Sequence, residues 1–330
     1  MRLTICFLSP MLVTCVGAWW LMLRMPGRSY IGTPPPPTER EMALAGSLRR
    51  DVEKLAGEIG ERNLVRYEAL AATAHYVEAE LTQSGYAVER NAFVGSANDQ
   101  RSTSNLIVEL KGSQSPREIV IIGAHYDSRE RTPGADDNAS GSAALLFLAR
   151  TFARQSPGRT LRFVFFTNEE YFRQELMGSL VYAKLCRARN DNIVAMVSLE
   201  TIGYFSDVVG SQRYPWPINL FYPPTGDFIG FVGNVGSGSL VRTALRSFRT
   251  VATLPSQGVA APESIDGVGW SDQWSFWRHG YPGIMITDTA PFRNPHYHEH
   301  TDTPGTLDYG RLARAVEGIE HVVRDLAGVQ

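Results

Sequence analysis

Four short segments composed almost entirely of apolar residues constrain the fold of this chain more than any other feature. They occupy residues 118–124, 161–167, 193–199 and 283–287. Strands without alternation of apolar and polar positions are typical of a sheet covered on both faces. Parallel strands of that kind need long crossover connections, which are usually helices. The four segments therefore predict the centre of an α/β sheet.

Helical spacing of apolar residues separates these predicted strands. We expect helices over residues 41–59, 67–84, 140–155, 177–187, 236–249 and 307–326, and further strands over 87–93 and 105–110. This alternation predicts a mostly parallel or mixed central sheet with helices on both faces. The pattern weakens over residues 204–272, where aromatic residues and prolines are frequent. We interpret that stretch as an insertion at the edge of the sheet that shapes a pocket.

The first 24 residues form a separate unit, either a transmembrane anchor or a signal segment. No charged residue occurs from Leu3 to Leu23, which is long enough to cross a bilayer as a helix. A cleaved signal peptide with its small-residue site at 16–18 is the alternative. Because the apolar run continues through residues 21–23, an anchor is favoured.

A proline-rich linker over residues 25–40 follows, with four consecutive prolines at 34–37. Such a sequence forms an extended, stiff spacer. Residues 41–330 then make a single domain, which a lone N-terminal anchor would export to a periplasmic or extracellular location. Arginines after the apolar run favour the opposite orientation by the positive-inside rule, so orientation stays open.

Charge and cysteine content exclude two classes of protein. The 32 Lys and Arg residues balance 34 Asp and Glu residues, leaving a net charge of −2, so no nucleic-acid partner is expected. Cys6 and Cys15 fall in the apolar run, and only Cys186 belongs to the domain. A disulfide within the domain is therefore excluded. The oligomeric state does not follow from the sequence.

Imidazoles and carboxylates follow the predicted buried strands at the point where each strand ends. They are His125, Asp127, Asp136, Asp137, Glu169, Glu170, Glu200, Asp288, His298 and His300. Ligands of open α/β sheets bind beyond the carboxyl ends of the strands, so these side chains should converge. Histidine and carboxylate ligands without cysteine suit zinc or a similar divalent ion. Their number suits two ions that share a bridging carboxylate and a water.

Each of these motifs also has an ordinary structural explanation when taken alone. A core turn would explain His125 and Asp127, a helix N-cap would explain residues 136–138, and a solvated loop would explain residues 169–170. Glu200 is harder to explain in this way, because a carboxylate directly after an apolar strand is costly to bury unpaired. The occurrence of all these motifs at strand ends favours a functional site.

Five segments of the chain resemble the M28 family of zinc peptidases. They are residues 125–128 (HYDS), 134–141 (GADDNASG), 168–170 (NEE), 198–203 (SLETIG) and 297–303 (YHEHTDT). The family includes bacterial leucyl aminopeptidases and, more distantly, glutaminyl cyclases. The resemblance covers roughly residues 63–326 and implies a zinc exopeptidase fold of the phosphorylase/hydrolase-like type.

The resemblance implies a role for each residue of these motifs. His125 and Glu200 would bind one zinc ion, Glu170 and His298 a second, and Asp137 would bridge them. Asp127 would orient His125, and Glu169 would be the general base. A cis peptide bond would join Asp136 to Asp137.

Two positions depart from the family pattern. Glu200 stands where the family commonly has Asp, and its longer side chain would shift the metal. Glu299 and His300 replace the family's Thr-Pro. His298 keeps the spacing to Asp302, so we choose it as the ligand over His296 and His300.

The sequence thus predicts a zinc-dependent aminopeptidase that acts on peptides. Glu200 and Asp272 would hold the substrate's α-ammonium group, although Asp272 equally fits the N-cap of a helix that begins at Gln273. Trp270 and Tyr297 are expected substrate contacts, and an aromatic-lined pocket would favour an apolar first residue. A glutaminyl cyclase is the alternative enzyme. A non-catalytic binding module of the same fold is disfavoured, because every ligand position and Glu169 are filled.

Overall fold

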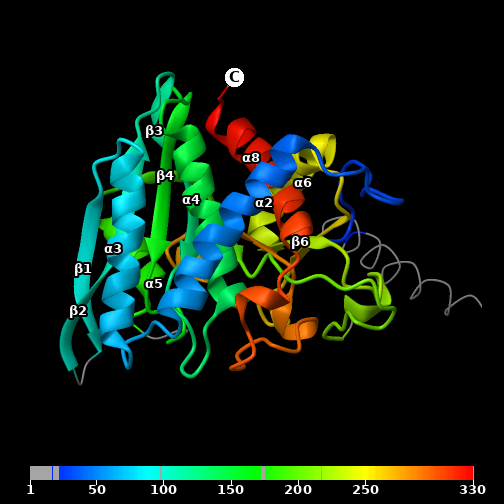
Figure 1. The fold of residues 1–330 in the computed structure, drawn as a ribbon. Coiled ribbons are helices and arrows are strands. Elements are labelled where there is room, and N and C mark those ends of the chain that lie inside the picture. The colour runs from blue at the N-terminus through cyan, green and yellow to red at the C-terminus, as the bar shows by residue number, and fades with distance from the viewer. Residues whose placement is uncertain (1–16, 18–21, 97–98, 172–174, 217, 330) are drawn as a thin grey trace, which may run out of the picture.

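One mixed sheet of eight strands organises the computed structural model, which describes residues 17, 22–96, 99–171, 175–216 and 218–329 (Figure 1). The strand order is β1-β2-β4-β3-β5-β8-β6-β7. The strands are β1 Glu89–Ser96, β2 Asp99–Leu110, β3 Ser115–His125, β4 Arg159–Phe166, β5 Asn192–Glu200, β6 Ile229–Asn234, β7 Ser256–Ala261 and β8 Gly283–Thr287.

The four apolar segments become the adjacent parallel strands β4, β3, β5 and β8 at the centre of this sheet. Strand β2 runs antiparallel to β4 and carries β1 at one edge. On the other side β6 runs antiparallel to β8 and parallel to the edge strand β7. The predicted mostly parallel or mixed sheet is therefore confirmed.

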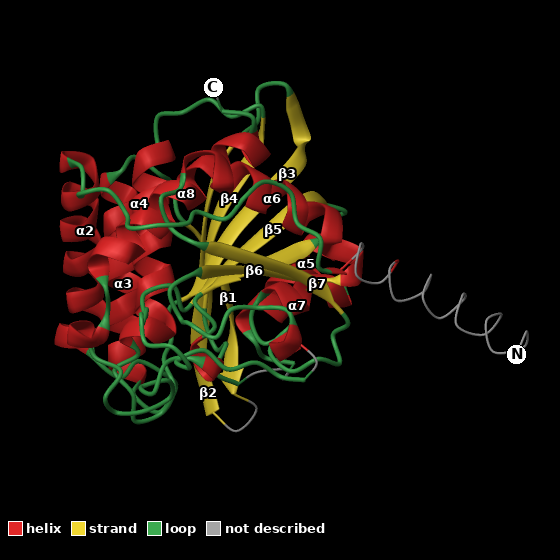
Figure 2. Ribbon diagram, turned by 90° about the vertical axis from the view of Figure 1, so that its right-hand side faces the viewer, coloured by secondary structure: helices red, strands yellow, loops and turns green. Residues whose placement is uncertain are grey.

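Helices cover both faces of the sheet (Figure 2). The helices are α2 Glu39–Val52, α3 Tyr67–Gln83, α4 Gly141–Phe152, α5 Gly178–Ala188, α6 Gly238–Val251, α7 Gln273–Arg278 and α8 Tyr309–Ala327. Helices α3, α4, α6 and α8 pack on one face with α2 outside them, and α5 and α7 pack on the other. Short helical turns occupy Glu53–Ile59, Ala135–Ser140, Ile218–Leu220, Val235–Ser237, Ala290–Phe292 and Pro304–Thr306.

Alternate residues of the central strands supply two separate cores. On β4, Phe163 and Phe165 pack with α4 and α8, whereas Val164 and Phe166 pack with α5. All four side chains are completely buried. Because both faces are apolar, the strand shows no polar alternation, which is the pattern seen in the sequence.

The interpretation of residues 204–272 as an insertion at the sheet edge is wrong in part. This stretch supplies β6 and β7, which extend the sheet beyond β8, and α6, which covers them. Both strands are rich in glycine, alanine and serine, residues that weaken a strand pattern. The loops on either side of these strands do line a pocket, described below.

The predicted membrane or signal segment lies almost entirely outside the described residues, so it stays a prediction. None of the helices in the described part of the chain combines the length and the apolar character needed to cross a bilayer.

The proline-rich segment predicted as a spacer runs along the domain. The Arg249 side chain donates a hydrogen bond to Pro26 O, and Arg314 donates one to Pro35 O. Helix α2 then begins at Glu39 with a capping box, in which the Thr38 hydroxyl accepts from Glu41 N and Thr38 N donates to the Glu41 carboxylate. This segment therefore follows the surface of α6 and α8.

Candidate metal centre

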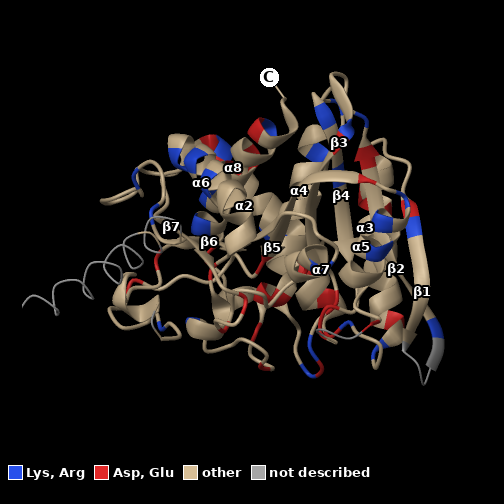
Figure 3. Cartoon of the chain, turned by 180° about the vertical axis from the view of Figure 1, so that it is seen from behind, with Lys and Arg blue, Asp and Glu red and all other residues tan. Residues whose placement is uncertain are grey.

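The carboxyl ends of the parallel strands bring the predicted ligands together. His125 is the last residue of β3, Glu200 is the last residue of β5, and Glu169 and Glu170 follow β4. Neighbouring parallel strands end at the same edge, so these side chains meet there. Figure 3 shows several acidic segments gathered at this end of the sheet, below the β5 label.

Two triads of candidate ligands share Asp137. In the first, His125 Nε2 lies 3.2 Å from Asp137 Oδ1 and 3.3 Å from Glu200 Oε2. In the second, His298 Nε2 lies 3.0 Å from Asp137 Oδ2 and 3.5 Å from Glu170 Oε2. Each triad uses a different oxygen of Asp137, which is the geometry of a bridging carboxylate.

The spacing of these atoms fits zinc. Zinc–ligand bonds of about 2.0–2.1 Å in a tetrahedron place neighbouring ligand atoms about 3.3 Å apart. The four separations in the two triads lie on either side of that value. In addition, both ring nitrogens of His125, Asp137 Oδ1 and Glu170 Oε1 are buried without a hydrogen-bond partner. Buried polar atoms normally have partners, so this donor set fits a bound cation.

The charge of the centre also favours a cation. Burial raises the pKa of Glu169 and Glu200, and His125 offsets only part of that shift. Burial raises the pKa of Glu170 well above its usual range, and Asp137 adds to it. Burial lowers the pKa of His125, but the surrounding carboxylates, Glu200 first among them, outweigh burial and raise it well above its ordinary value. Negative charge therefore exceeds the positive charge available, and divalent ions would compensate it.

Asp127 connects the ends of β3 and β4. Its Oδ1 lies 3.4 Å from His125 Nδ1 and accepts from Glu169 N, while its Oδ2 accepts from Glu170 N. One carboxylate thus fixes the ring of one candidate ligand and the backbone of another. This arrangement agrees with the orienting role expected from the sequence.

Residues with positive φ make the sharp turns that follow the strands. Asn168 follows β4 with φ 60°, Thr201 follows β5 with φ 44°, and His298 itself has φ 61°. Non-glycine residues in this region cost about 1–3 kcal/mol each and cluster at functional sites. Hydrogen bonds stabilise the turns, since Asn168 Nδ2 donates to Gly95 O and Thr201 N donates to Asn138 Oδ1.

The loop that carries Asp137 corrects one expectation. The cis peptide bond joins Asp137 to Asn138, one residue later than predicted. The Asn138 side chain points to β5, where its Nδ2 donates to Leu199 O. The loop therefore directs the carboxylate of Asp137 to the two histidines and the amide of Asn138 to the sheet.

Asp302 holds the same loop from the opposite side. Its Oδ1 accepts from Asp136 N at 2.9 Å and its Oδ2 accepts from Asp137 N at 3.1 Å. Asp302 is buried, so these two hydrogen bonds form in a low dielectric. The sequence interpretation used Asp302 only to fix the spacing to His298 and missed this role.

We expect Asp302→Asn to weaken zinc binding by about 10- to 100-fold, as is typical when a residue that supports a metal ligand is changed. An amide offers one acceptor oxygen in place of two, so one of the two backbone N–H groups loses its partner. Competition with a chromophoric chelator measures the affinity. Asp325→Asn, at an exposed carboxylate of α8, is the matched control. Equal affinity of the Asp302 variant and the parent protein would contradict this role.

Arg62 is a second residue that sequence reasoning missed. Its guanidinium is completely buried and donates to the carbonyls of Tyr126, Pro133 and Gly134. These carbonyls belong to the two loops that carry Asp127 and Asp137. Burial lowers the pKa of Arg62 to about 10, although the nearby carboxylates, Asp127 first, oppose the shift. An isolated arginine between two helices gave no sequence signal for this role.

The longer side chain of Glu200 has a dedicated partner. Ser271 Oγ donates to Glu200 Oε2 at 2.6 Å, and Ser198 Oγ lies 3.0 Å from Ser271 Oγ. The two hydroxyls fix the carboxylate within reach of His125, so the departure from the family pattern preserves the triad. Ser271 was not among the predicted site residues.

The three predicted substrate contacts occupy different environments. Asp272 precedes α7, but its side chain makes no capping hydrogen bond. The carboxylate is completely buried, and both of its oxygens lack hydrogen-bond partners. Trp270 is 39% exposed and stacks on Phe292 with the ring centroids 6.1 Å apart. Tyr297 stacks on His298 at 3.8 Å.

A large pocket opens beside the first triad. Glu200, Trp270 and Tyr297 line one end of it, and the pocket encloses about 800 Å³ including its open mouth. Its remaining walls come from β6, β7, β8 and the loops around residues 214–216, 218–222 and 265–270.

The sequence and the fold of this chain both match known proteins. Residues 105–323 match the family described as Peptidase family M28. The chain is 34% identical over 294 residues to the uncharacterized protein YfbL of Escherichia coli K12, covering 86% of this chain and 88% of that protein. Its fold resembles a zinc aminopeptidase of Bacillus subtilis (TM-score 0.68, 14% identity, 87% and 95% of the two chains). It also resembles a glutaminyl cyclase of Tannerella forsythia (TM-score 0.64, 21% identity, 84% and 97%).

Proposed function

Because this chain belongs to peptidase family M28, we propose that it is a two-zinc aminopeptidase that hydrolyses the first peptide bond of its substrates. The observation that carries the proposal is the pair of triads that share the two oxygens of Asp137. A complete second triad supports two ions, as expected for hydrolysis with a bridging water.

In this proposal His125, Asp137 and Glu200 hold one zinc ion, and Asp137, Glu170 and His298 hold the other. Two ions at these positions would lower the pKa of a shared water towards neutrality and polarise the scissile carbonyl. Asp127, Asp302 and Arg62 keep the ligand-bearing loops in place through the contacts described above.

In this proposal Glu169 is the general base that takes a proton from the attacking water. Its side chain belongs to neither triad, yet Oε2 lies 4.0 Å from His125 Nε2, and 8% of the residue surface stays exposed. A slightly exposed carboxylate beside the ligands can accept a proton from the attacking water and deliver it to the leaving amine. Burial raises the pKa of Glu169 well above its ordinary value, and the neighbouring carboxylates of Glu200 and Asp272 add to that shift, which suits a group that exchanges a proton.

Recognition of the substrate's free amino group follows from the negative charge of the centre. We expect Glu200, at the pocket end, and the neighbouring Glu169 to face the α-ammonium group. Asp272 has no exposed surface, so we expect no direct contact between it and the α-ammonium group.

We expect zinc-loaded protein to release p-nitroaniline from leucyl-p-nitroanilide and to lose that activity when a chelator removes the metal. An N-terminal glutaminyl peptide is the discriminating substrate, because a cyclase converts it to a pyroglutamyl peptide with release of ammonia. An aminopeptidase releases free glutamine instead, and mass spectrometry separates the two products. If the protein forms the pyroglutamyl product and hydrolyses neither substrate, it is a glutaminyl cyclase and the aminopeptidase proposal is wrong.

A further inference from the structure

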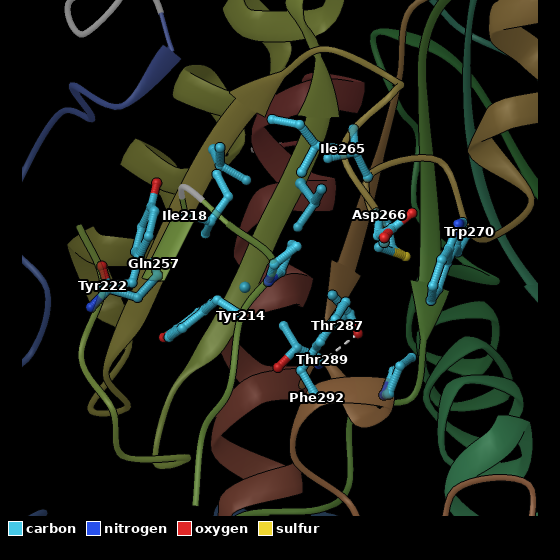
Figure 4. A pocket seen from close by; sticks show the side chains of 18 of the residues that line it. Tyr214, Ile218, Tyr222, Gln257, Ile265, Asp266, Trp270, Thr287, Thr289 and Phe292 are labelled. Carbon is cyan, nitrogen blue, oxygen red and sulfur yellow. Dashed lines mark hydrogen bonds between the residues drawn. The ribbon is translucent and has the colours of Figure 1, made fainter. Parts of the chain in front are cut away.

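The pocket beside the metal centre has the sheet itself as its floor. Glu200, Thr287, Gly230 and Gln257 are consecutive cross-strand neighbours on β5, β8, β6 and β7. All four residues line the pocket. Strands lie about 4.8 Å apart, so this row spans about 14 Å from the metal centre to the sheet edge. Figure 4 shows Trp270 at one end of the pocket and Tyr222 with Gln257 at the other.

The middle of the floor is low because Gly230 has no side chain. The three atoms nearest to a Cβ placed there would be Thr287 O at 3.3 Å and two threonine methyl groups at 3.5 and 3.8 Å. A second row, Met285, Val232 and Val259, runs parallel to the first and is apolar. The pocket is therefore a channel that continues past Gly230 to the sheet edge.

Several polar side chains in the walls of this channel are already hydrogen-bonded within the protein. Tyr214 Oη donates to Pro223 O, and Tyr222 Oη donates to Gly258 O. Thr287 Oγ1 accepts from Thr289 N and lies 3.1 Å from Thr201 Oγ1. A peptide backbone would need a donor and an acceptor for each residue. These walls favour a chain that carries no polar groups.

The charged side chains around the channel further restrict the kind of ligand that it can bind. Among the described residues that line the channel, the charged side chains are Glu200, at the metal end, and Asp266, which is exposed. Both are acidic, so an anionic tail would be repelled. The aromatic and branched side chains that make up the other walls suit an uncharged hydrocarbon.

From these observations we infer that the channel binds a linear alkyl chain, about ten carbons long, on the carbonyl side of the scissile amide. A zigzag chain with C–C bonds of about 1.5 Å advances about 1.3 Å per carbon, so ten carbons fill the row. This inference rests on the proposed amide hydrolysis at the metal centre. The alkyl chain can belong to a 2-amino acid with a long side chain or to a fatty acyl group.

A length series of p-nitroanilides tests the inference and separates the two sources. The substrates are alanyl, norleucyl, 2-aminodecanoyl, 2-aminododecanoyl and dodecanoyl amides, kept below their aggregation concentrations. Each buried methylene is worth about fourfold, so we expect kcat/KM to rise by at least about tenfold from norleucyl to 2-aminodecanoyl. Preference for dodecanoyl over 2-aminododecanoyl would assign a fatty acyl substrate. A maximum at norleucyl or below would overturn the inference.

Gly230→Leu should close the channel at its middle and lower the ratio of kcat/KM for 2-aminododecanoyl to that for alanyl by at least about tenfold. Val232→Phe narrows the channel at the second row, and it replaces Gly230→Leu in this test if the glycine variant does not fold. Gly46→Leu, at an exposed helix position with open space around it, is the matched control. An unchanged ratio in folded channel variants would overturn the inference.

Calorimetric titration of zinc-loaded protein with butylamine and decylamine measures the affinity of the channel for an alkyl chain without any turnover. We expect decylamine to bind more tightly by at least about tenfold and Gly230→Leu to remove the difference. If no amide is hydrolysed while this difference persists, the proposed function fails and the alkyl channel stands. Equal affinities for the two amines would overturn the channel regardless of activity.

Discussion

Glu169→Gln is expected to lower kcat by about a thousandfold while the protein keeps its full zinc content. Proton transfer by a positioned side chain contributes about 10²- to 10⁴-fold to an enzymatic rate, and an amide cannot accept the proton. The substitution preserves the shape of the side chain. Glu169 is in neither triad, so the ligands stay complete.

Steady-state hydrolysis of leucyl-p-nitroanilide together with zinc analysis of the purified variant checks this prediction. Glu170→Gln is the informative comparison, because Glu170 belongs to the second triad and its variant should lose zinc as well as activity. If Glu169→Gln turns over at the parent rate, another group is the base. Loss of zinc from that variant would make Glu169 a ligand.

Asp137→Ala should have the second large effect, the loss of both ions and of measurable activity. Its two oxygens lie 3.2 Å from His125 Nε2 and 3.0 Å from His298 Nε2, so one substitution removes a ligand from each triad. Burial raises the pKa of Asp137, but the two imidazoles outweigh burial and hold it below its usual range. The carboxylate is therefore ionised and available to metal.

Thermal unfolding with and without zinc distinguishes lost binding from lost folding. Zinc at 100 times its dissociation constant stabilises the folded state by about 2.7 kcal/mol for each site. The parent protein should gain that stability, and Asp137→Ala should not. Without metal, the variant should be somewhat less stable than the parent, because the two imidazoles that hold the pKa of Asp137 below its usual range lose their carboxylate partner. Glu299→Gln, an exposed carboxylate next to His298, is the control. Retention of two zinc ions by Asp137→Ala would exclude a bridging role.

Strand ends were the most informative part of the sequence. A strand buried on both faces has an unmistakable apolar pattern, and the polar residue that follows it must lie at the sheet edge. That logic placed His125, Glu170 and Glu200 correctly at one edge of the sheet. Strands β6 and β7 lacked such a pattern, because glycine and small residues replace the branched ones. One of these glycines, Gly230, leaves room for the channel.

The sequence by itself determined the central sheet, the edge that carries the chemistry and the residue types of the candidate ligands. These properties depend on local hydrophobic periodicity and on the order in which the strands follow one another along the chain. Both can be read directly from the sequence. Only the tertiary structure decided which oxygen of Asp137 faces which histidine, and that Asp302, Arg62 and Ser271 hold the ligands in place. The contacts of Asp302, Arg62 and Ser271 join residues 64 to 166 positions apart. Their geometry depends on loop conformation and side-chain packing, which no local pattern encodes.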